Sequence, residues 1–452
     1  MAAADAQQKL WAQMTPDEKL EHRLSAWMNP GVPFESADAE AAYKARVQRI
    51  IDAVLLEKEP DRVPVPLVTA EVYPAVWGGL TPYDAMYDFP KAAKAFLDFN
   101  LEFQPDAMVP PVIGALPGRV YELLDYKLYS WPGHGVPKEA SFQYNEAEWM
   151  KAAEYDEFID DPSDFLLRRY VPRICGSLGG LSKLGSILDP GLMAFGAGYF
   201  ATWAQPEVLE SLEKLVAAGK EAAAWFGQLV PELVRLMTLG FPSYFQVATQ
   251  APFDYLGDEL RGTKEVLLDL YRRPQKVVAA CERLAPMMTR WAVGKSTPDT
   301  IPFVFWPLHK GAEGFLSQEQ FETFYWPTLR TTALGLIEEG FIPVFFGEGA
   351  MDSRLEVIAR DLPKGRSVWI LDRSDMAYAK EVLGKTAAIQ GNVPLSLLQL
   401  STPEAVREYC RKLIEVAAPG GGFLLDSGAV IHQGKAENIR AMVQAARDYG
   451  VY

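Results

Sequence analysis

The sequence predicts an α/β protein organised as a (β/α)₈ TIM barrel, with an N-terminal helical extension and a helical insertion. Short and almost purely apolar segments recur along the chain, as expected for strands that are buried on both faces of a parallel sheet. Amphipathic segments with helical spacing separate most of them. Eight such units in about 390 residues favour a closed barrel over an open sheet.

The predicted strands and helices alternate along the chain. The first strand opens at 60–69, and a second follows at 105–110 after a helix at 90–103. We expect a further strand just before His134. The later strands are predicted at 241–248, 301–308, 341–346, 367–371, 387–389 and 422–425. Helices between them are predicted at 264–271, 318–339, 403–416 and 436–449.

These elements divide the chain into two parts. Residues 1–58 form the N-terminal helical extension, and residues 59–452 form the barrel, with a helical excursion at about 145–235. No predicted strand is followed by GxGxxG or GxxxxGK[ST]. A dinucleotide-binding or P-loop fold therefore loses its usual sequence support.

Composition and charge restrict the function. The chain has 452 residues, of which 49% are hydrophobic and 23% charged, as in a globular enzyme. Its net charge of -15 disfavours nucleic acid and anionic membranes, so we expect a small-molecule substrate or a protein partner. Three cysteines form no CxxC motif, and residues 1–20 lack the pattern of a secretion signal. We expect a cytoplasmic protein.

The segment 341–352 carries the clearest sign of a reactive site. Its apolar run ends abruptly in Gly347, Glu348 and Gly349, with Asp352 close behind. In a barrel of parallel strands, the working residues lie at the C-terminal ends of the strands. Glu348 stands between glycines and has no helix to cap, so a role in catalysis or metal binding is predicted for it.

Polar residues follow the other predicted strands as well, and each has an alternative structural role. His309 is a candidate catalytic residue or a structural histidine. Asp372 is a candidate catalytic residue or a helix N-cap, and Asp375 is the better N-cap for a helix at 376–383. Asn392 is a substrate-binding candidate that could also hold a turn, and Asp352 could cap a helix at 353–359. His432, in the segment that follows the last predicted strand at 422–425, is a metal-ligand candidate or an exposed loop residue.

Aromatic residues cluster near several predicted strand ends, which indicates a large apolar cavity. Many of these rings could equally be ordinary core. The substrate-binding candidates are Tyr73, Trp306, Tyr244, Asn392 and Asp352.

Ordered motifs in the C-terminal part of the chain resemble the uroporphyrinogen decarboxylase superfamily, which includes the decarboxylase and corrinoid-dependent methyltransferases. They are the segment 311–317 with Tyr325-Trp326-Pro327, then Gly391-Asn392-Val393-Pro394, then Thr402-Pro403-Glu404, and finally 420–424 with Glu437-Asn438. Pro60-Asp61-Arg62-Val63-Pro64 extends the resemblance to the start of the barrel. The family fold is a (β/α)₈ barrel, which agrees with the pattern of strands and helices.

Departures from the family pattern separate its branches. The decarboxylase has an arginine-rich segment after its first strand, where this chain has Glu71-Val72-Tyr73-Pro74. A polyanionic porphyrinogen would therefore meet acid where it needs base. Thiol-methylating members hold zinc with a His-x-Cys motif and a later cysteine. Phe346, Glu348 and Ala429 stand at these positions, so the His/Cys/Cys zinc site of the family is lost.

The resemblance implies a corrinoid (cobalamin)-dependent methyltransferase that acts on a small aromatic or apolar molecule. The chain has no Asp-x-His-x-x-Gly signature, so the corrinoid would come free or on a separate corrinoid-binding protein. If a metal such as zinc is bound, Glu348 and His432 are its candidate ligands, with Asp352, Asp372 or His309 as further donors. An oxygen leaving group needs a proton or a metal, and Glu348 could supply either.

Two other functions remain open. One is a carboxy-lyase of the uroporphyrinogen decarboxylase type that acts on a smaller acid. The other is a non-catalytic barrel that binds a tetrapyrrole or a corrinoid.

Overall fold

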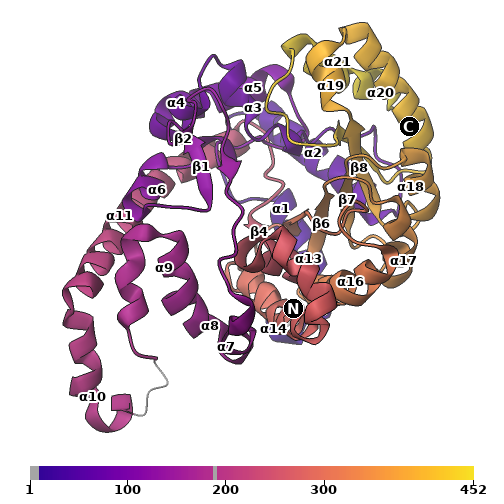
Figure 1. Ribbon diagram of the computed structural model, residues 1–452. Coiled ribbons are helices and arrows are strands. Elements are labelled where there is room, and N and C mark those ends of the chain that lie inside the picture. The colour runs from indigo at the N-terminus through magenta and orange to yellow at the C-terminus, as the bar shows by residue number, and fades with distance from the viewer. Residues whose placement is uncertain (1–9, 187–190) are drawn as a thin grey trace, which may run out of the picture.

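A parallel sheet of six strands forms the centre of the computed structural model, which describes residues 10–186 and 191–452 (Figure 1). The strands pair in chain order from β4 to β9. Their bounds are β4 (Val247–Ala248), β5 (Phe303–Leu308), β6 (Ile342–Gly347), β7 (Val368–Leu371), β8 (Ala388–Val393) and β9 (Phe423–Ser427).

The register brings the C-terminal ends of these strands together. Leu308 of β5 pairs with Gly347 of β6, which in turn pairs with Leu371 of β7. Leu371 pairs with Gly391 of β8. Polar residues that directly follow the strands therefore share one end of the sheet, as the sequence predicts.

Helices connect successive strands and cover the outside of the sheet (Figure 1). Helix α16 runs between β5 and β6 and begins with Trp326-Pro327, where the proline ring suits the first helical turn. The covering helices are α12 (Pro252–Asp254), α13 (Thr263–Arg272), α14 (Pro274–Gly294), α15 (Gln318–Gln320), α16 (Trp326–Glu338), α17 (Leu355–Asp361), α18 (Met376–Val382), α19 (Leu395–Leu400), α20 (Pro403–Ala417) and α21 (Ala436–Tyr449).

Two extended segments continue the sheet beyond β9. The N–H of Leu425 in β9 donates to the carbonyl of Pro64 (2.9 Å), and the N–H of Asp106 donates to the carbonyl of Val65 (2.9 Å). Met108 then donates to the carbonyl of Pro242 (2.8 Å), a few residues before β4. The predicted α/β fold of TIM-barrel type is confirmed. The strands predicted at 60–69 and 105–110 are extended segments between β9 and β4 and are not assigned as strands, and the first ends before the 3-10 turn Val68–Ala70.

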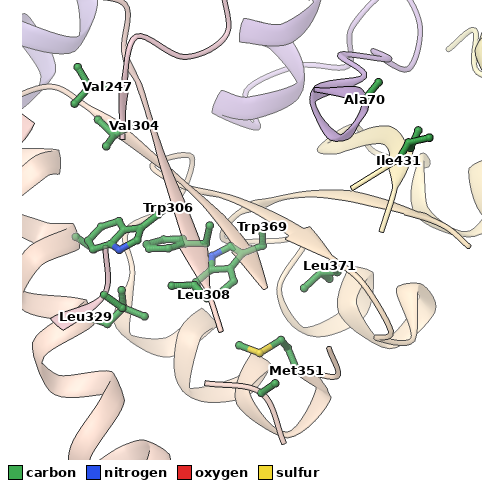
Figure 2. Packing of buried hydrophobic residues seen from close by; sticks show 14 of the residues in the cluster. Ala70, Val247, Val304, Trp306, Leu308, Leu329, Met351, Trp369, Leu371 and Ile431 are labelled. Atoms are coloured by element: carbon green, nitrogen blue, oxygen red, sulfur yellow. The ribbon is translucent and has the colours of Figure 1, made fainter. Parts of the chain in front are cut away.

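The residues of each strand face two different cores. Phe303, Val344, Phe346 and Leu424 pack together on the inner side with residues of α1 (Pro16–Met28) and α2 (Ala37–Leu55). Their neighbours along the strands pack outward against the helices. Figure 2 shows part of the outer layer, where Trp306 and Leu308 lie on the side of Leu329 in α16.

A helical arm and a small sheet interrupt the barrel between 106 and 242. The small sheet has the order β2-β1-β3. The prediction of a barrel strand before His134 is wrong, because β1 (Tyr129–Pro132) pairs only with β2 (Gly135–Val136) and β3 (Gln143–Tyr144) in the described chain. Local β propensity cannot distinguish a hairpin sheet from a barrel strand.

The long helix α11 (Pro206–Thr238) runs along this arm, which projects from the barrel (Figure 1). The other helices between 106 and 242 are α6 (Gly118–Leu124), α7 (Tyr155–Asp160), α8 (Pro162–Phe165), α9 (Val171–Ile174) and α10 (Gly191–Ala201). The helices α3 (Tyr73–Trp77), α4 (Pro82–Tyr87) and α5 (Phe89–Phe103) lie between the two extended segments. In the described part of the chain, every helix is too short or too polar to cross a membrane.

We expect alanine at Gly391 to destabilise the fold at the end of β8. Gly391 has φ +120°, and a Cβ atom there would lie 2.6 Å from the carbonyl oxygen of Leu371 in the neighbouring strand. Strain and overlap together should lower the free energy of unfolding by about 2–3 kcal/mol. Gly420, with φ +79° and no atom within 4 Å of its Cβ position, is the control for φ alone. Urea denaturation of both alanine variants should rank Gly391→Ala as the less stable, and equal stabilities would contradict the expected overlap.

Candidate functional site

A cluster of acidic and basic side chains forms where β4 and β5 end. His309 and Lys310 directly follow β5, and two aspartates come from the turn of helix after β4: Asp254 ends α12, and Asp258 lies in the π-helical segment Tyr255–Arg261. The ring nitrogen Nδ1 of His309 lies 2.7 Å from Oδ2 of Asp258, and the ammonium of Lys310 pairs with Oδ1 of the same carboxylate.

Asp254 fixes the backbone that carries the two basic residues. Its carboxylate accepts hydrogen bonds from the backbone N–H groups of His309 (3.0 Å) and Lys310 (2.9 Å). The hydroxyl of Tyr325, which begins one of the family-like motifs, donates to it at 2.6 Å. Burial and the charge of Asp258 raise the pKa of Asp254. This aspartate is therefore a positioning residue.

His309 is held in its protonated form. Burial alone would lower the pKa of the imidazole, but the hydrogen bond to Asp258 and the charges of nearby carboxylates outweigh it and raise the pKa to about 9. Burial likewise opposes ionisation of Asp258, yet His309 and Lys310 lower its pKa. Within the described residues, Nε2 of His309 has no hydrogen-bond partner, so its proton is free for a ligand.

Glu348 lies one strand further along, directly after β6. Its carboxylate is accessible at the mouth of the barrel although protein surrounds most of it. This partial burial raises the pKa of Glu348, and the charges of Asp254, Asp372 and Asp258 add to the effect while His309 opposes it. Glu348 is therefore poised to exchange a proton closer to neutral pH than an ordinary glutamate.

A second glutamate, Glu71, lies close enough to Glu348 for their charges to interact. Glu71 follows the short 3-10 turn Val68–Ala70 after the first extended segment. Burial, reinforced by the charge of Glu348, raises the pKa of Glu71 to about 7. In the sequence, Glu71 stands out only as a departure from the arginine-rich segment of the family, because its proximity to Glu348 depends on the fold.

An apolar cavity of about 510 Å³ opens beside Glu71. Aromatic residues of β5 and of the segment before β4 form one wall, and α11 forms another. This volume suits a small organic ligand. Its wall includes Glu71, Tyr244, Phe245 and Phe305.

Two of the substrate-binding candidates are fully enclosed elsewhere, and one lines the cavity. Trp306 has no exposed surface and stacks 5.1 Å from the ring of Phe345 in the outer layer (Figure 2). Tyr73 is buried in α3 and donates to the carbonyl of Gly434 (2.9 Å). The structure thus does not bring Trp306 or Tyr73 to the cavity. Tyr244 lies in its wall.

The other strand-end candidates hold the loops of the mouth. Asn392 donates to the carbonyls of Asp372 (3.1 Å) and Ser374 (2.8 Å), in line with a turn-holding role. Asp372 accepts from the N–H of Gly349 (3.1 Å), which fixes the loop beside Glu348. Asp352 does not cap its own helix, because it accepts from the N–H of Asp375 (2.8 Å). The expected N-cap role of Asp375 is confirmed.

The predicted metal ligands are not assembled into a metal centre. His432 is exposed and lines a second cavity, of about 350 Å³, with Val72 and Phe142. Across residues 10–186 and 191–452, no group of three or more His, Cys, Asp or Glu side chains is arranged to hold a metal ion. The donor set therefore does not fit a resident zinc ion.

Asp426 is a buried polar residue near the C-terminal end of β9. Its carboxylate has no exposed surface and accepts hydrogen bonds from the backbone of Val68 (3.0 Å) and from Gln390 Nε2 (2.9 Å), as well as from Thr69. Burial raises its pKa to about 6 despite these donors. Asp426 thereby ties the loop that carries Glu71 to β8 and β9.

The fold and the site together define a barrel protein of (β/α)₈ type with an acid–base cluster at its strand ends. Residues 245–449 match the family model of uroporphyrinogen decarboxylase (URO-D). The resemblance to this superfamily seen in the sequence is confirmed. Among solved structures, the chain is similar to a methyltransferase from Methanosarcina mazei, with a TM-score of 0.54 and 14% identity over 90% of this chain and 98% of that one. No curated protein matches the sequence.

Proposed function

We propose that the protein is an enzyme that moves a methyl group between a small aromatic or apolar substrate and a corrinoid. The observation that carries the proposal is the protonated His309, braced by Asp258, at the same end of the barrel as Glu348 and an apolar cavity. The family match and the fold shared with a methyltransferase support this assignment.

The volume of the cavity supports different binding places for the two reactants. About 510 Å³ accommodates a small organic molecule, whereas a corrin macrocycle with its side chains needs far more room. The corrinoid is therefore a second substrate that approaches the barrel mouth from outside, free or on a partner protein. It supplies a cobalt centre that accepts or donates the methyl group.

The residues of this chain supply the proton chemistry. When a methyl group leaves an ether, the C–O bond breaks and the oxygen keeps the bonding electrons, so a proton on that oxygen lowers the barrier. His309 would donate this proton from Nε2, and Asp258 would stabilise the imidazolium beforehand. In the reverse direction, the neutral imidazole of His309 would take the proton from an attacking hydroxyl at the same nitrogen, and the Glu348 carboxylate would pass that proton to solvent at the barrel mouth.

A spectroscopic assay tests the proposal. The purified protein is mixed with cob(I)alamin and a panel of aryl methyl ethers, or with methylcobalamin and phenols, while the cobalt absorption is followed. We expect a protein-dependent change with at least one ether or phenol. An unchanged spectrum with every compound would refute methyl transfer.

We expect Glu348→Gln to slow this reaction by roughly tenfold to a hundredfold, because the amide cannot exchange a proton at the barrel mouth. Glu319→Gln, at an exposed glutamate of α15, is the matched control and should keep the full rate. Initial rates of the absorption change measure both variants. Equal rates for the two would remove Glu348 from the chemistry.

The cationic His309 also favours a second candidate, a carboxy-lyase that acts on a small acid. A protonated imidazole at the mouth can hold a substrate carboxylate and then donate the proton that replaces carbon dioxide. Such an enzyme would release carbon dioxide from a panel of small carboxylic acids without any corrinoid, and the absence of release would leave methyl transfer as the single proposal.

A further inference from the structure

The cavity contains a carboxylate without a counter-charge. Glu71 is the one charged residue in its wall, and no Lys, Arg or His side chain lines it. Neither Glu71 nor the nearby Glu348 makes a side-chain hydrogen bond or a salt bridge with any described residue. An unpaired carboxylate against apolar walls is costly, which indicates that a ligand completes the site.

Tyr244 contributes an aromatic face to the cavity wall. It is 2% exposed and lines the cavity. Its hydroxyl has no accessible surface and Tyr244 packs with the inner core, so the ring and not the hydroxyl would meet a ligand.

Aromatic faces lie in the same cavity wall as the Glu71 carboxylate. The rings of Tyr244 and Phe245 lie 4.6 Å apart, and those of Phe245 and Phe305 lie 5.0 Å apart. Phe245 and Phe305 are partly exposed. Aromatic rings attract organic cations through the negative potential over their faces, and a carboxylate beside them adds a full charge.

We propose that this cavity recognises an organic ammonium group of the substrate, with Glu71 and Glu348 as the counter-charge and with Phe245, Phe305 and the ring of Tyr244 as the aromatic wall. The inference rests on the proposed function in so far as the ligand is the small substrate of methyl transfer. It narrows that substrate to small organic cations with an apolar outline.

The charges around the mouth agree with a cationic ligand. The basic groups at this end of the barrel are His309 and Lys310, which pair with Asp258, and Arg373, which pairs with Asp372 (3.5 Å). The acidic groups at this end of the barrel outnumber them, and they are Glu71, Glu348, Asp254, Asp258 and Asp372. A divalent metal fits less well, because it requires several oxygen ligands at once and the cavity wall offers one carboxylate.

Proton linkage gives the site a distinctive pH dependence. The pKa of Glu71 lies at about 7, and a cation binds its ionised form. A quaternary ammonium ion keeps its charge at every pH, so its affinity should rise about tenfold between pH 6 and pH 8 through titration of the protein.

Choline and its neutral isostere 3,3-dimethylbutan-1-ol provide the test, because they share one shape and one hydroxyl but differ in charge. Isothermal titration calorimetry of the protein without corrinoid should give choline at least tenfold tighter binding at pH 8. Glu71→Gln should abolish this preference and its pH dependence, and Glu348→Gln should weaken it. Tyr244→Phe keeps the ring and should change neither affinity, and Glu319→Gln should likewise change nothing.

Several outcomes would overturn the inference: no binding of choline, equal affinity for both compounds, or a preference that survives in Glu71→Gln with an unchanged melting temperature. Displacement of choline by Mg²⁺ or Mn²⁺ at micromolar concentration would identify a metal site instead. Because no corrinoid is present in the calorimetry, choline binding there is measured independently of methyl transfer. Choline binding together with an unchanged cobalt spectrum for every compound in the spectroscopic assay would contradict the proposed function alone. Turnover of uncharged ethers without choline binding would contradict this inference alone.

Discussion

Replacing His309 with asparagine is expected to lower the rate of methyl transfer from aryl ethers by about a hundredfold or more. The asparagine amide can still donate to Asp258, so the loop should keep its conformation. It cannot carry the proton that the imidazolium offers from Nε2. His134→Asn is the matched control, because His134 lies outside the barrel and contacts Tyr87. A rate equal to that of this control would remove His309 from the reaction.

The pH dependence of the rate provides a second measurement of the same residue. The interactions with Asp258 raise the pKa of His309 to about 9, against the opposing effect of burial. The protonated form is therefore present at neutral pH, and the rate should fall as the pH rises through about 9. The contribution of His309 to folding stability has the same sign, since it is complete below pH 6.5 and is lost above about 9. The basic limb of the profile should disappear in His309→Asn.

The apolar run 341–346 shows how far the sequence predicts the fold. Its continuous hydrophobicity predicts a buried parallel strand with Glu348 at the strand end, and in the structure Glu348 directly follows β6. The same continuity hides which residues face inward. Phe346 belongs to the inner core and Phe345 to the outer core, although nothing in the run distinguishes them.

Trp306 illustrates the consequence of this ambiguity. A tryptophan near a strand end is as compatible with a ligand cavity as with the layer between sheet and helices. A shift of one residue exchanges the two faces of a strand, and Phe305, its neighbour, is the ring that lines the cavity. In a strand that is buried on both faces, the sequence pattern does not indicate which residues line the cavity.

Asp254 and Asp258 were missed although the sequence carries a signal for them. They are four residues apart, soon after the strand predicted at 241–248, so one helical turn presents both on one face. Their importance becomes clear only through His309 and Lys310, which lie more than fifty residues away in the chain. Contacts of this kind depend on the register of β4 and β5 and cannot be derived from local sequence.

Replacing Asp106 with alanine is expected to lower the free energy of unfolding by about 3–5 kcal/mol. Asp106 is 1% exposed and accepts hydrogen bonds from Arg49 (2.7 Å), from Arg62 (2.8 Å) and from the N–H of Val65 (2.7 Å). The alanine variant would leave two largely buried guanidinium groups without their shared carboxylate. These contacts lie where α2 meets both extended segments between β9 and β4, so the loss should loosen this side of the barrel.

The dependence of the unfolding free energy on pH below 7 distinguishes the loss of the Asp106 charge from a simple loss of packing. Burial opposes ionisation of Asp106, but the charges of Arg62 and Arg49 dominate and lower its pKa. A lowered pKa stabilises the folded state at neutral pH, and this stabilisation is lost as the pH falls through the folded-state value. Urea denaturation between pH 7 and pH 3 should therefore show a smaller loss of stability in Asp106→Ala than in the parent protein.

Asp98→Ala provides the comparison, because Asp98 pairs with Lys94 on the exposed face of α5. An exposed pair of this kind contributes about 0–1 kcal/mol. If both variants unfolded at the same urea concentration, the Arg49–Asp106–Arg62 cluster would contribute no more than a surface pair. A markedly lower urea midpoint for Asp106→Ala would instead show that this buried charge cluster stabilises the two extended segments beside β9. Through the first of these segments it would also stabilise the loop that carries Glu71 at the cavity.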